Sequence, residues 1–178
     1  MNYEEYKRKL IEFNKREKYA IEMDFLCRQV EPISKEKILD YGCGTGQMVW
    51  HIKNRYGAEC FGYDKYNFVI KNDEYVFRSE YFFQFDKIYF MHSFAHIEIG
   101  TIFNNLELFL KPGGSVYILT PNIEYLYEHK TPDYVPDPTV IRHYSLGELK
   151  TKFDLNGFKV IDSGTYSNNE RIFLKATK

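Results

Sequence analysis

Long apolar runs are missing from this sequence. No stretch approaches the roughly 20 apolar residues that a membrane-spanning helix needs, and the N-terminal residues, MNYEEYKRKL, lack the apolar segment of a signal peptide. Cysteine is also scarce: Cys27, Cys43 and Cys60 are odd in number and scattered, which indicates neither a disulfide framework nor a zinc site. The sequence therefore predicts a cytoplasmic protein that binds neither a membrane nor a metal.

An excess of charge of either sign is missing as well. The formal net charge is -1, so no overall field attracts nucleic acid or an anionic membrane. The basic residues between Lys7 and Lys18 alternate with glutamates, which is typical of the solvated face of a helix. Aromatic residues are abundant, at 18% of the chain. They indicate either an aromatic-lined pocket or, more simply, bulky core filling.

What the sequence does contain is an alternation of short apolar runs and longer amphipathic ones. Its 178 residues fit a single domain, 1–178, with an N-terminal helical segment at 1–34 and a core at 35–178. Strands are predicted at 37–41, 59–63, 75–78, 86–91, 115–119, 158–162 and 171–176. Helices are predicted as a pair within 3–30 and at 47–56, 99–110 and 146–156. The stretch 121–139 holds all but two of the six prolines and is predicted to be a long loop or lid.

This order of elements predicts an α/β fold. Strands that alternate with helices form a parallel sheet with right-handed crossovers, here a Rossmann-like, doubly wound and mostly parallel one. The last two strands have no helix between them, so they are predicted to form an antiparallel C-terminal hairpin at one edge of the sheet.

A glycine cluster, DYGCGTG from Asp40 to Gly46, lies between the first predicted strand and the helix that follows it. Glycines let the backbone turn sharply and approach a ligand closely, and ligands of open α/β sheets bind at the carboxyl ends of the strands. Asp64 ends the second predicted strand, 18 residues beyond Gly46. A carboxylate at that place can accept hydrogen bonds from both hydroxyls of a ribose.

The spacing of the glycines separates this cluster from two other nucleotide-binding motifs. The dinucleotide fingerprint requires a third glycine at position 47, where this chain has Gln47. This argues against a nicotinamide-dependent oxidoreductase. No G-K-[ST] sequence follows the glycines, which excludes a P-loop.

The segment ILDYGCGTG resembles motif I of the class I S-adenosylmethionine-dependent methyltransferases. The resemblance extends along the chain through FGYD, FDKIYFMHSFAHI, LKPGGSVYILTPN and RHYSLGELKTKFDLNGFKV. It is greatest to the small-molecule methyltransferases of the ubiquinone and polysaccharide-biosynthesis type. The resemblance implies S-adenosyl-L-methionine as the cofactor and a small-molecule acceptor, with a hydroxyl as the expected methyl acceptor.

The resemblance also assigns roles to individual positions. The glycine loop would pass under the methionine and ribose of the cofactor, Asp40 would orient the methionine amino group, and Asp64 would bind the ribose hydroxyls. Lys65 and Tyr66 would lie beside the adenine, whose amine would meet Ser79 or Glu80. The cofactor-binding residues implied in this way are Asp40, Gly42, Cys43, Gly44, Thr45, Gly46, Asp64, Lys65, Met91 and His92, with Phe90 beside them.

Two histidines are candidates for the general base that would deprotonate a hydroxyl acceptor. His96 follows the strand at 86–91, and His143 follows the proline-rich stretch; a packing or capping role is the alternative for each. His92 and His96 have the spacing of a zinc motif, but position 93 is Ser93 where a catalytic HExxH has glutamate. We therefore assign no metal to this pair.

Other features bear on the acceptor. Arg142 is a candidate to bind a phosphate or carboxylate on it, with a surface salt bridge as the alternative. The region after the fourth predicted strand reads MHSF rather than the D/N-P-P-Y/F of DNA amino-methylating enzymes, so no nucleic-acid partner is expected. The chain is expected to be a monomer or homodimer. Candidates to wall an acceptor pocket are Tyr125, Tyr127, Tyr134 and Tyr144.

The chain departs from the family pattern at two places. The stretch from Asp64 to Asp86 is short, and Ala95 replaces the glutamate expected before His96. The short stretch, together with the short overall length of the chain, keeps a second function open: a catalytically degenerate, methyltransferase-like binding module.

Overall fold

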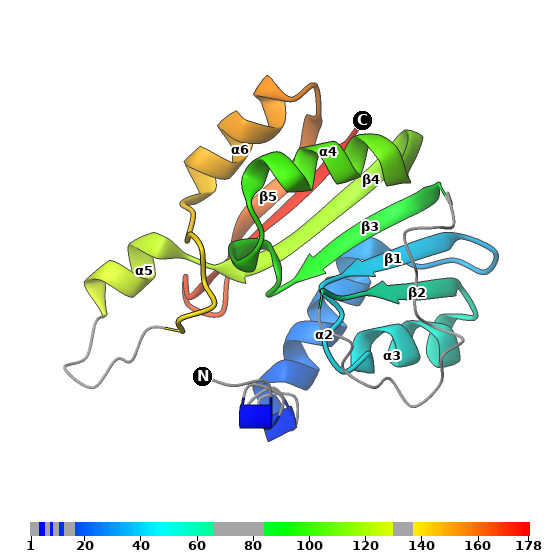
Figure 1. Cartoon of the computed structure of the whole chain (residues 1–178), viewed down its shortest axis with the longest axis horizontal. Coiled ribbons are helices and arrows are strands. Elements are labelled where there is room, and N and C mark those ends of the chain that lie inside the picture. The colour runs from blue at the N-terminus through cyan, green and yellow to red at the C-terminus, as the bar shows by residue number, and fades with distance from the viewer. Residues whose placement is uncertain (1–3, 6–7, 9–10, 13–16, 66–83, 130–136) are drawn as a thin grey trace.

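In the computed structural model, the described residues are 4–5, 8, 11–12, 17–65, 84–129 and 137–178 (Figure 1). The short strand expected at 75–78 lies outside this set, as do the candidate residues Tyr66, Ser79, Glu80 and Tyr134. Within it, no helix combines the length and apolar character needed to cross a bilayer.

The described strands form one mixed sheet in the order β2-β1-β3-β4-β6-β5. The four strands from β2 to β4 pair in parallel. β6 is antiparallel to both β4 and β5, so the predicted parallel sheet with an antiparallel hairpin is confirmed. The strands are β1 (Lys37–Tyr41), β2 (Glu59–Tyr63), β3 (Phe85–Met91), β4 (Leu110–Pro121), β5 (Lys159–Tyr166) and β6 (Arg171–Thr177).

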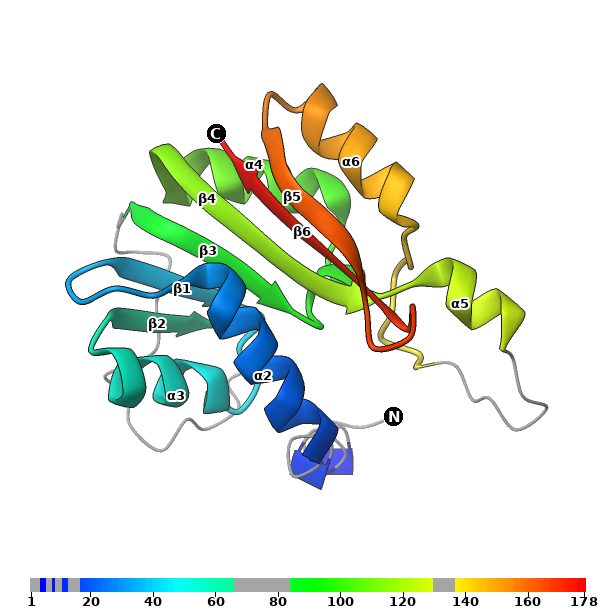
Figure 2. The same cartoon turned by 180° about the vertical axis from the view of Figure 1, so that it is seen from behind.

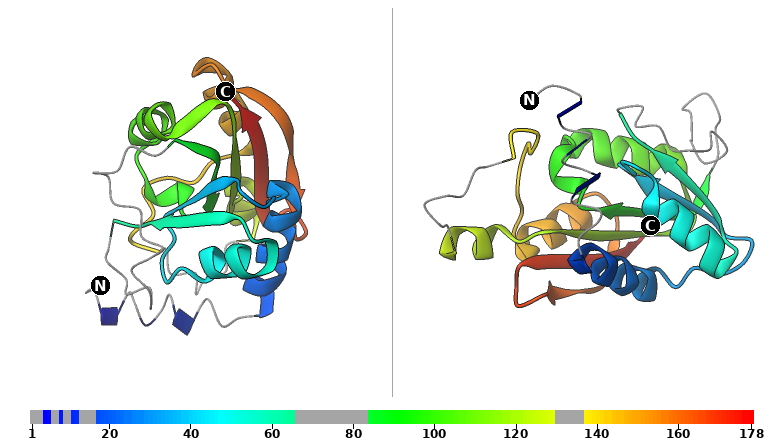
Figure 3. Two further views of the ribbon diagram at one scale, coloured as in Figure 1. Left: turned by 90° about the vertical axis from the view of Figure 1, so that its right-hand side faces the viewer. Right: turned by 90° about the horizontal axis from the view of Figure 1, so that it is seen from below.

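Helices cover both faces of this sheet (Figure 3). Residues of α2 and α3 pack with Ile38, Tyr89 and Tyr117 in one apolar cluster. Residues of α4 and α6 pack with Ile88 and Phe90 in the other. The sheet is therefore the middle of three layers, and the helices are α2 (Glu17–Val30), α3 (Gln47–Tyr56), α4 (Ile99–Phe109) and α6 (Leu146–Leu155).

The strand order reverses beside β1. The chain leaves β1 through α3 to β2 on one side, and β3 pairs on the other side of β1. Such a switch point opens a crevice at the carboxyl ends of the two strands, where open α/β sheets bind ligands. Figure 2 shows α2 crossing one face of the sheet with its first turn near these carboxyl ends.

Two regions differ from the elements predicted for them. β4 begins at Leu110 rather than 115, because the glycines after Pro112 are accommodated as an irregularity in its pairing with β3. Part of the predicted lid is a short helix, α5 (Ile123–Glu128). Asn122 explains this helix, since its side chain accepts a hydrogen bond from the backbone N–H of Glu124 at 3.1 Å, as an N-cap residue does.

Candidate active site

The glycine loop after β1 is fixed to both neighbouring strands. The backbone N–H groups of Gly42 and Cys43 donate to the Tyr63 carbonyl, at 2.7 and 3.0 Å. On the other side, the Ser93 hydroxyl donates to the Tyr41 carbonyl. Gly42 has φ +87°, and a Cβ added there would lie 2.2 Å from the Cβ of Ser93. Only glycine therefore fits at this point, where the loop turns and touches the end of β3.

Asp64 lies beside the same loop, at the end of β2. Its carboxylate accepts a hydrogen bond from the backbone N–H of Gly44 at 2.8 Å. The side chain of Asp64 is half-buried, and that of Lys65 next to it is exposed. The loop and the acidic end of β2 are thus held together, as the sequence analysis expected for a shared site.

Asp40 is a deeply buried acid at the start of the loop. It is 2% exposed, and its Oδ1 has no hydrogen-bond partner among the described residues. Burial raises the pKa of Asp40 well above its ordinary value, and the charge of Asp64 raises it further. An unpaired buried carboxylate is costly, so this oxygen is suited to a cationic or hydrogen-bond-donating ligand.

His92 directly follows β3 and has a backbone in the left-handed region, with φ +60°. Its Nε2 lies 2.8 Å from one carboxylate oxygen of Glu22 on α2, and the other oxygen lies 3.0 Å from Nε of Arg171 at the start of β6. The Glu22 side chain is only 1% exposed. We call these three residues the buried ion cluster; it joins α2, β3 and β6 at the carboxyl edge of the sheet.

Burial and the neighbouring charges have opposite effects on the pKa of Glu22, and burial and Glu22 have opposite effects on the pKa of His92. Burial raises the pKa of Glu22, but the hydrogen bond from His92 and the charges of His92, Arg171 and Lys18 outweigh it, so the pKa lies below its ordinary value. Burial lowers the pKa of His92 despite the opposite effect of Glu22. Glu22 is therefore held ionised, hydrogen-bonded to His92 and paired by charge with Arg171.

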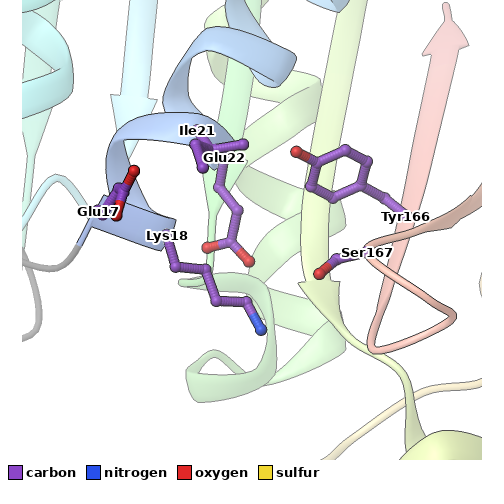
Figure 4. A pocket seen from close by; sticks show the side chains of 6 residues that line it. All are labelled: Glu17, Lys18, Ile21, Glu22, Tyr166 and Ser167. Atoms are coloured by element: carbon purple, nitrogen blue, oxygen red, sulfur yellow. The ribbon is translucent and has the colours of Figure 1, made fainter.

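A shallow pocket of about 400 Å³ opens next to the cluster. Figure 4 shows Lys18 and Glu22 on α2 facing Tyr166, the last residue of β5, and Ser167 of the β5–β6 turn across it. An ion pair between Lys18 and Glu170 joins the same two elements. The N-terminal half of α2 is thus tied to the β5–β6 turn through Lys18 and to His92, directly after β3, through Glu22.

The two candidate bases lie near one another on the acceptor side. His96 ends a short 3-10 turn after β3, and its charge acts on His143. Nδ1 of His96 lies 2.9 Å from the Thr139 hydroxyl, which donates to Asp137 at 2.7 Å. Nδ1 of His143 is buried without a hydrogen-bond partner in the described part of the chain, and burial lowers the pKa of this histidine.

A second pocket, of about 490 Å³, has His143 among its lining residues, and His96 is not one of them. Its wall combines apolar side chains such as Ile123 and Val140 with His143 and the exposed ring of Tyr127. Arg142 also lines it, but its guanidinium is paired with Glu148. Of the other tyrosine candidates, Tyr144 is buried and Tyr125 stacks on His129; neither lines this pocket.

The structure brings the expected cofactor-binding residues together. The residues of the glycine loop, Asp40 and Asp64 meet at the switch point, and Met91 ends the neighbouring strand, with His92 directly after it. Glu22 and Thr139 were missed by the sequence analysis. Glu22 shares a helix face with the buried Tyr19 and Leu26, and an acid on a buried face is a signal that could have been used.

No group of three or more His, Cys, Asp or Glu side chains in the described ranges is arranged to hold a metal ion.

Comparison with known proteins places this geometry in a family. A family model described as a methyltransferase domain matches residues 7–163. No curated protein matches the chain in sequence. Many solved structures resemble it, at identities that by themselves show the fold alone.

Three of these structures illustrate the likeness. A SAM-dependent methyltransferase from Aquifex aeolicus has a TM-score of 0.70 and 14% identity, over 96% of this chain and 97% of that one. The PH0226 protein from Pyrococcus horikoshii OT3 has a TM-score of 0.70 and 16% identity, over 92% of each chain. A geranyl diphosphate C-methyltransferase from Streptomyces coelicolor A3(2), in complex with Mg²⁺, geranyl-S-thiolodiphosphate and S-adenosyl-L-homocysteine, has a TM-score of 0.63 and 14% identity, over 89% and 76%.

Proposed function

Since this chain belongs to the methyltransferase family, as a class I S-adenosylmethionine-dependent member, we propose that it methylates a hydroxyl group of a small molecule. The cofactor would bind at the glycine loop. The acceptor would bind in the pocket between α5 and residues 137–143, with the methyl group passing between the two sites at the end of β3.

The unpaired Oδ1 of Asp40 is the observation that carries the cofactor site. S-adenosylmethionine has a protonated amino group, and a buried carboxylate oxygen without a partner fits it. Gly42, Gly44 and Gly46, all with positive φ, leave the loop without side chains where a ligand must approach the backbone. The described residues therefore fit this cofactor.

The remaining cofactor contacts follow from the same arrangement. Asp64 is held at the loop by the Gly44 N–H, and we assign it to the ribose hydroxyls. Met91 and His92 form the opposite wall, at the end of β3. Cys43, Thr45 and Lys65 complete the set of cofactor-binding residues that we propose.

On the acceptor side, the chain's task is to position a hydroxyl and take its proton. The bound cofactor supplies a methyl group that is already activated on a sulfonium, so correct placement of the acceptor accounts for much of the catalysis. The apolar wall of the second pocket would exclude water and orient the acceptor. His96 and His143 are the nearby imidazoles, the side chain most often used as a general base.

Calorimetric titration with S-adenosylmethionine and, separately, with NAD tests the cofactor site. We expect binding of the first only, weakened about 10- to 100-fold in Asp64→Ala, because hydrogen bonds to a charged group contribute about 1.5–3 kcal/mol. Asp162→Ala, an exposed aspartate on β5, is the matched control and should bind as the wild type does.

Transfer of labelled methyl groups to a panel of phenols, alcohols, amines and thiols then tests the reaction. Methylation of hydroxyl compounds supports the proposal. Tight binding of the cofactor without transfer to any member of the panel would favour the degenerate binding module instead. Failure to bind S-adenosylmethionine would overturn the proposed function altogether.

A further inference from the structure

The hydrogen bonds around His96 form a chain with a defined direction. A carboxylate only accepts hydrogen bonds, and a hydroxyl has a single proton to donate. The Thr139 hydroxyl donates to Asp137 Oδ1 at 2.7 Å, so its oxygen is left to accept from Nδ1 of His96, 2.9 Å away. The proton of a neutral His96 then lies on Nδ1, and Nε2 bears the lone pair.

Residues 137–144 are held firmly enough to impose this direction. The backbone N–H of Thr139 also donates to Asp137 Oδ1, at 2.9 Å. Ile141 and Arg142 both donate to the Ala95 carbonyl, at 2.9 and 3.1 Å, which fixes the segment to the turn that carries His96. Figure 1 shows this segment, in gold before α6, running past the turn that follows β3.

We propose that Thr139 and Asp137 are positioning residues that keep the proton of His96 on Nδ1, so that Nε2 is the atom that takes the proton of the acceptor hydroxyl. This inference rests on the methyl transfer proposed above. In the reaction the acceptor oxygen loses its proton to Nε2 and gains a bond to the methyl carbon. The carbon–sulfur bond breaks, its electron pair stays on sulfur, and no oxidant or reductant is needed.

The same reasoning separates His96 from His143. Nδ1 of His143 has no hydrogen-bond partner among the described residues, so no group fixes which of its ring nitrogens bears the proton. Its place in the wall of the second pocket suits it to contact the acceptor rather than to deprotonate it. The charges of His92, directly after β3, and of His143 interact with that of His96. Asp137 is linked to His96 through the Thr139 hydroxyl.

Nitrogen NMR of the ¹⁵N-histidine-labelled chain tests the proposal without any ligand. The His96 signals, assigned by their loss in His96→Asn, should show a protonated Nδ1 and an unprotonated Nε2 at a pH where the ring is neutral. Thr139→Val, which removes the acceptor oxygen at nearly constant volume, should shift the proton towards Nε2. Thr139→Ser should restore the wild-type signals, and Thr165→Val, an exposed threonine on β5, should leave them unchanged.

Activity is the second readout, on the acceptor found in the panel. Thr139→Val should lower kcat by about tenfold, a fraction of the 10²–10⁴-fold typical of general-base catalysis, with little change in KM and none in the affinity for S-adenosylmethionine. Thr139→Ser should recover kcat. A wild-type His96 protonated on Nε2, or a Thr139→Val variant with unchanged proton position or unchanged kcat, would overturn the inference. Failure of the proposed function would appear separately, as loss of cofactor binding or of transfer in the wild type.

Discussion

The glycine loop and the second pocket draw their residues from the chain in opposite ways. The loop, Asp40 and Asp64 lie within one β-α-β unit and meet through two short turns. The pocket takes its wall from α5, from residues 137–143 and from α6, and its candidate base His96 from the turn after β3. A site contained in one supersecondary unit can be predicted from a local sequence motif. A site assembled from several segments depends on how those segments pack.

Removal of the candidate base should give the largest effect, and only on the acceptor side. His96→Asn keeps an N–H donor near the place of Nδ1 while removing Nε2. We expect kcat to fall by about 10²–10⁴-fold, with the affinity for S-adenosylmethionine unchanged. Steady-state kinetics and calorimetry check this, with His129→Asn on the exposed end of α5 as the control. A fall in cofactor affinity would mean that the cofactor site and the acceptor pocket do not act independently.

Breaking the buried ion cluster should affect the cofactor site and the acceptor pocket together. Glu22→Gln leaves Arg171 and His92 without their anionic partner, and loss of one member of a buried ion pair costs about 3–5 kcal/mol. Thermal or urea unfolding measures this loss, with the exposed Glu17→Gln on the same helix as the control.

The effect of Glu22→Gln should also depend on pH. The pKa of Glu22 is lowered in the folded chain, so its stabilising contribution is present above the ordinary glutamate pKa and is lost as the pH falls through the lowered value. The difference in stability between the wild type and the variant should therefore shrink in acid. A difference that stays constant with pH would show that Glu22 acts through packing rather than charge.

A side chain in the glycine loop should lower the stability of the fold by an intermediate amount. Gly42→Ala places a Cβ against Ser93 and forces alanine into a positive φ, which costs about 1–3 kcal/mol. Gly147→Ala is the matched control, since nothing lies within 4 Å of its added Cβ and alanine favours a helix. Equal unfolding midpoints for the two variants would contradict the close contact between the loop and the end of β3.

The smallest effect, and one of opposite sign, is expected from Asp40→Asn. Because the pKa of Asp40 is raised in the folded chain, ionisation above the ordinary aspartate value opposes folding, and the penalty grows as the pH rises through the raised value. The cofactor-free variant should therefore be more stable at neutral pH by about 1 kcal/mol, or about 2–4 °C, with no gain in acid. It should also bind S-adenosylmethionine more weakly; a variant without added stability would contradict the unpaired state of Oδ1.

Much of this fold could be predicted because its signals are local. KILDY and ECFGY are short apolar runs beside glycines, and β1 and β2 begin and end where those runs do. The family expected from ILDYGCGTG is confirmed by the match over residues 7–163. The helix at Ile123–Glu128 was missed since prolines dominate its surroundings and its Asn122 cap was not weighed.

The contacts of the candidate site are less visible in the sequence. Asp40 and Asp64 could be named from the motif, but the pairing of Glu22 with His92 and Arg171 joins residues from both ends of the described chain. Thr139 reaches His96 only because the Ala95 carbonyl holds residues 141–142 in place. Neither contact has a sequence period or spacing that indicates it. The roles of the individual site residues therefore stay predictions.

The position of β6 has a consequence for how the chain folds during its synthesis. Among the described strands, β5 joins the sheet only through β6, which pairs between it and β4. Arg171 at the start of β6 supplies a partner of Glu22. A chain emerging from the ribosome therefore has the glycine loop, α2 and His92 before it has the cation that pairs with Glu22 on α2. We expect the nascent protein to remain open at this edge, and accessible to chaperones and proteases, until β6 is synthesised.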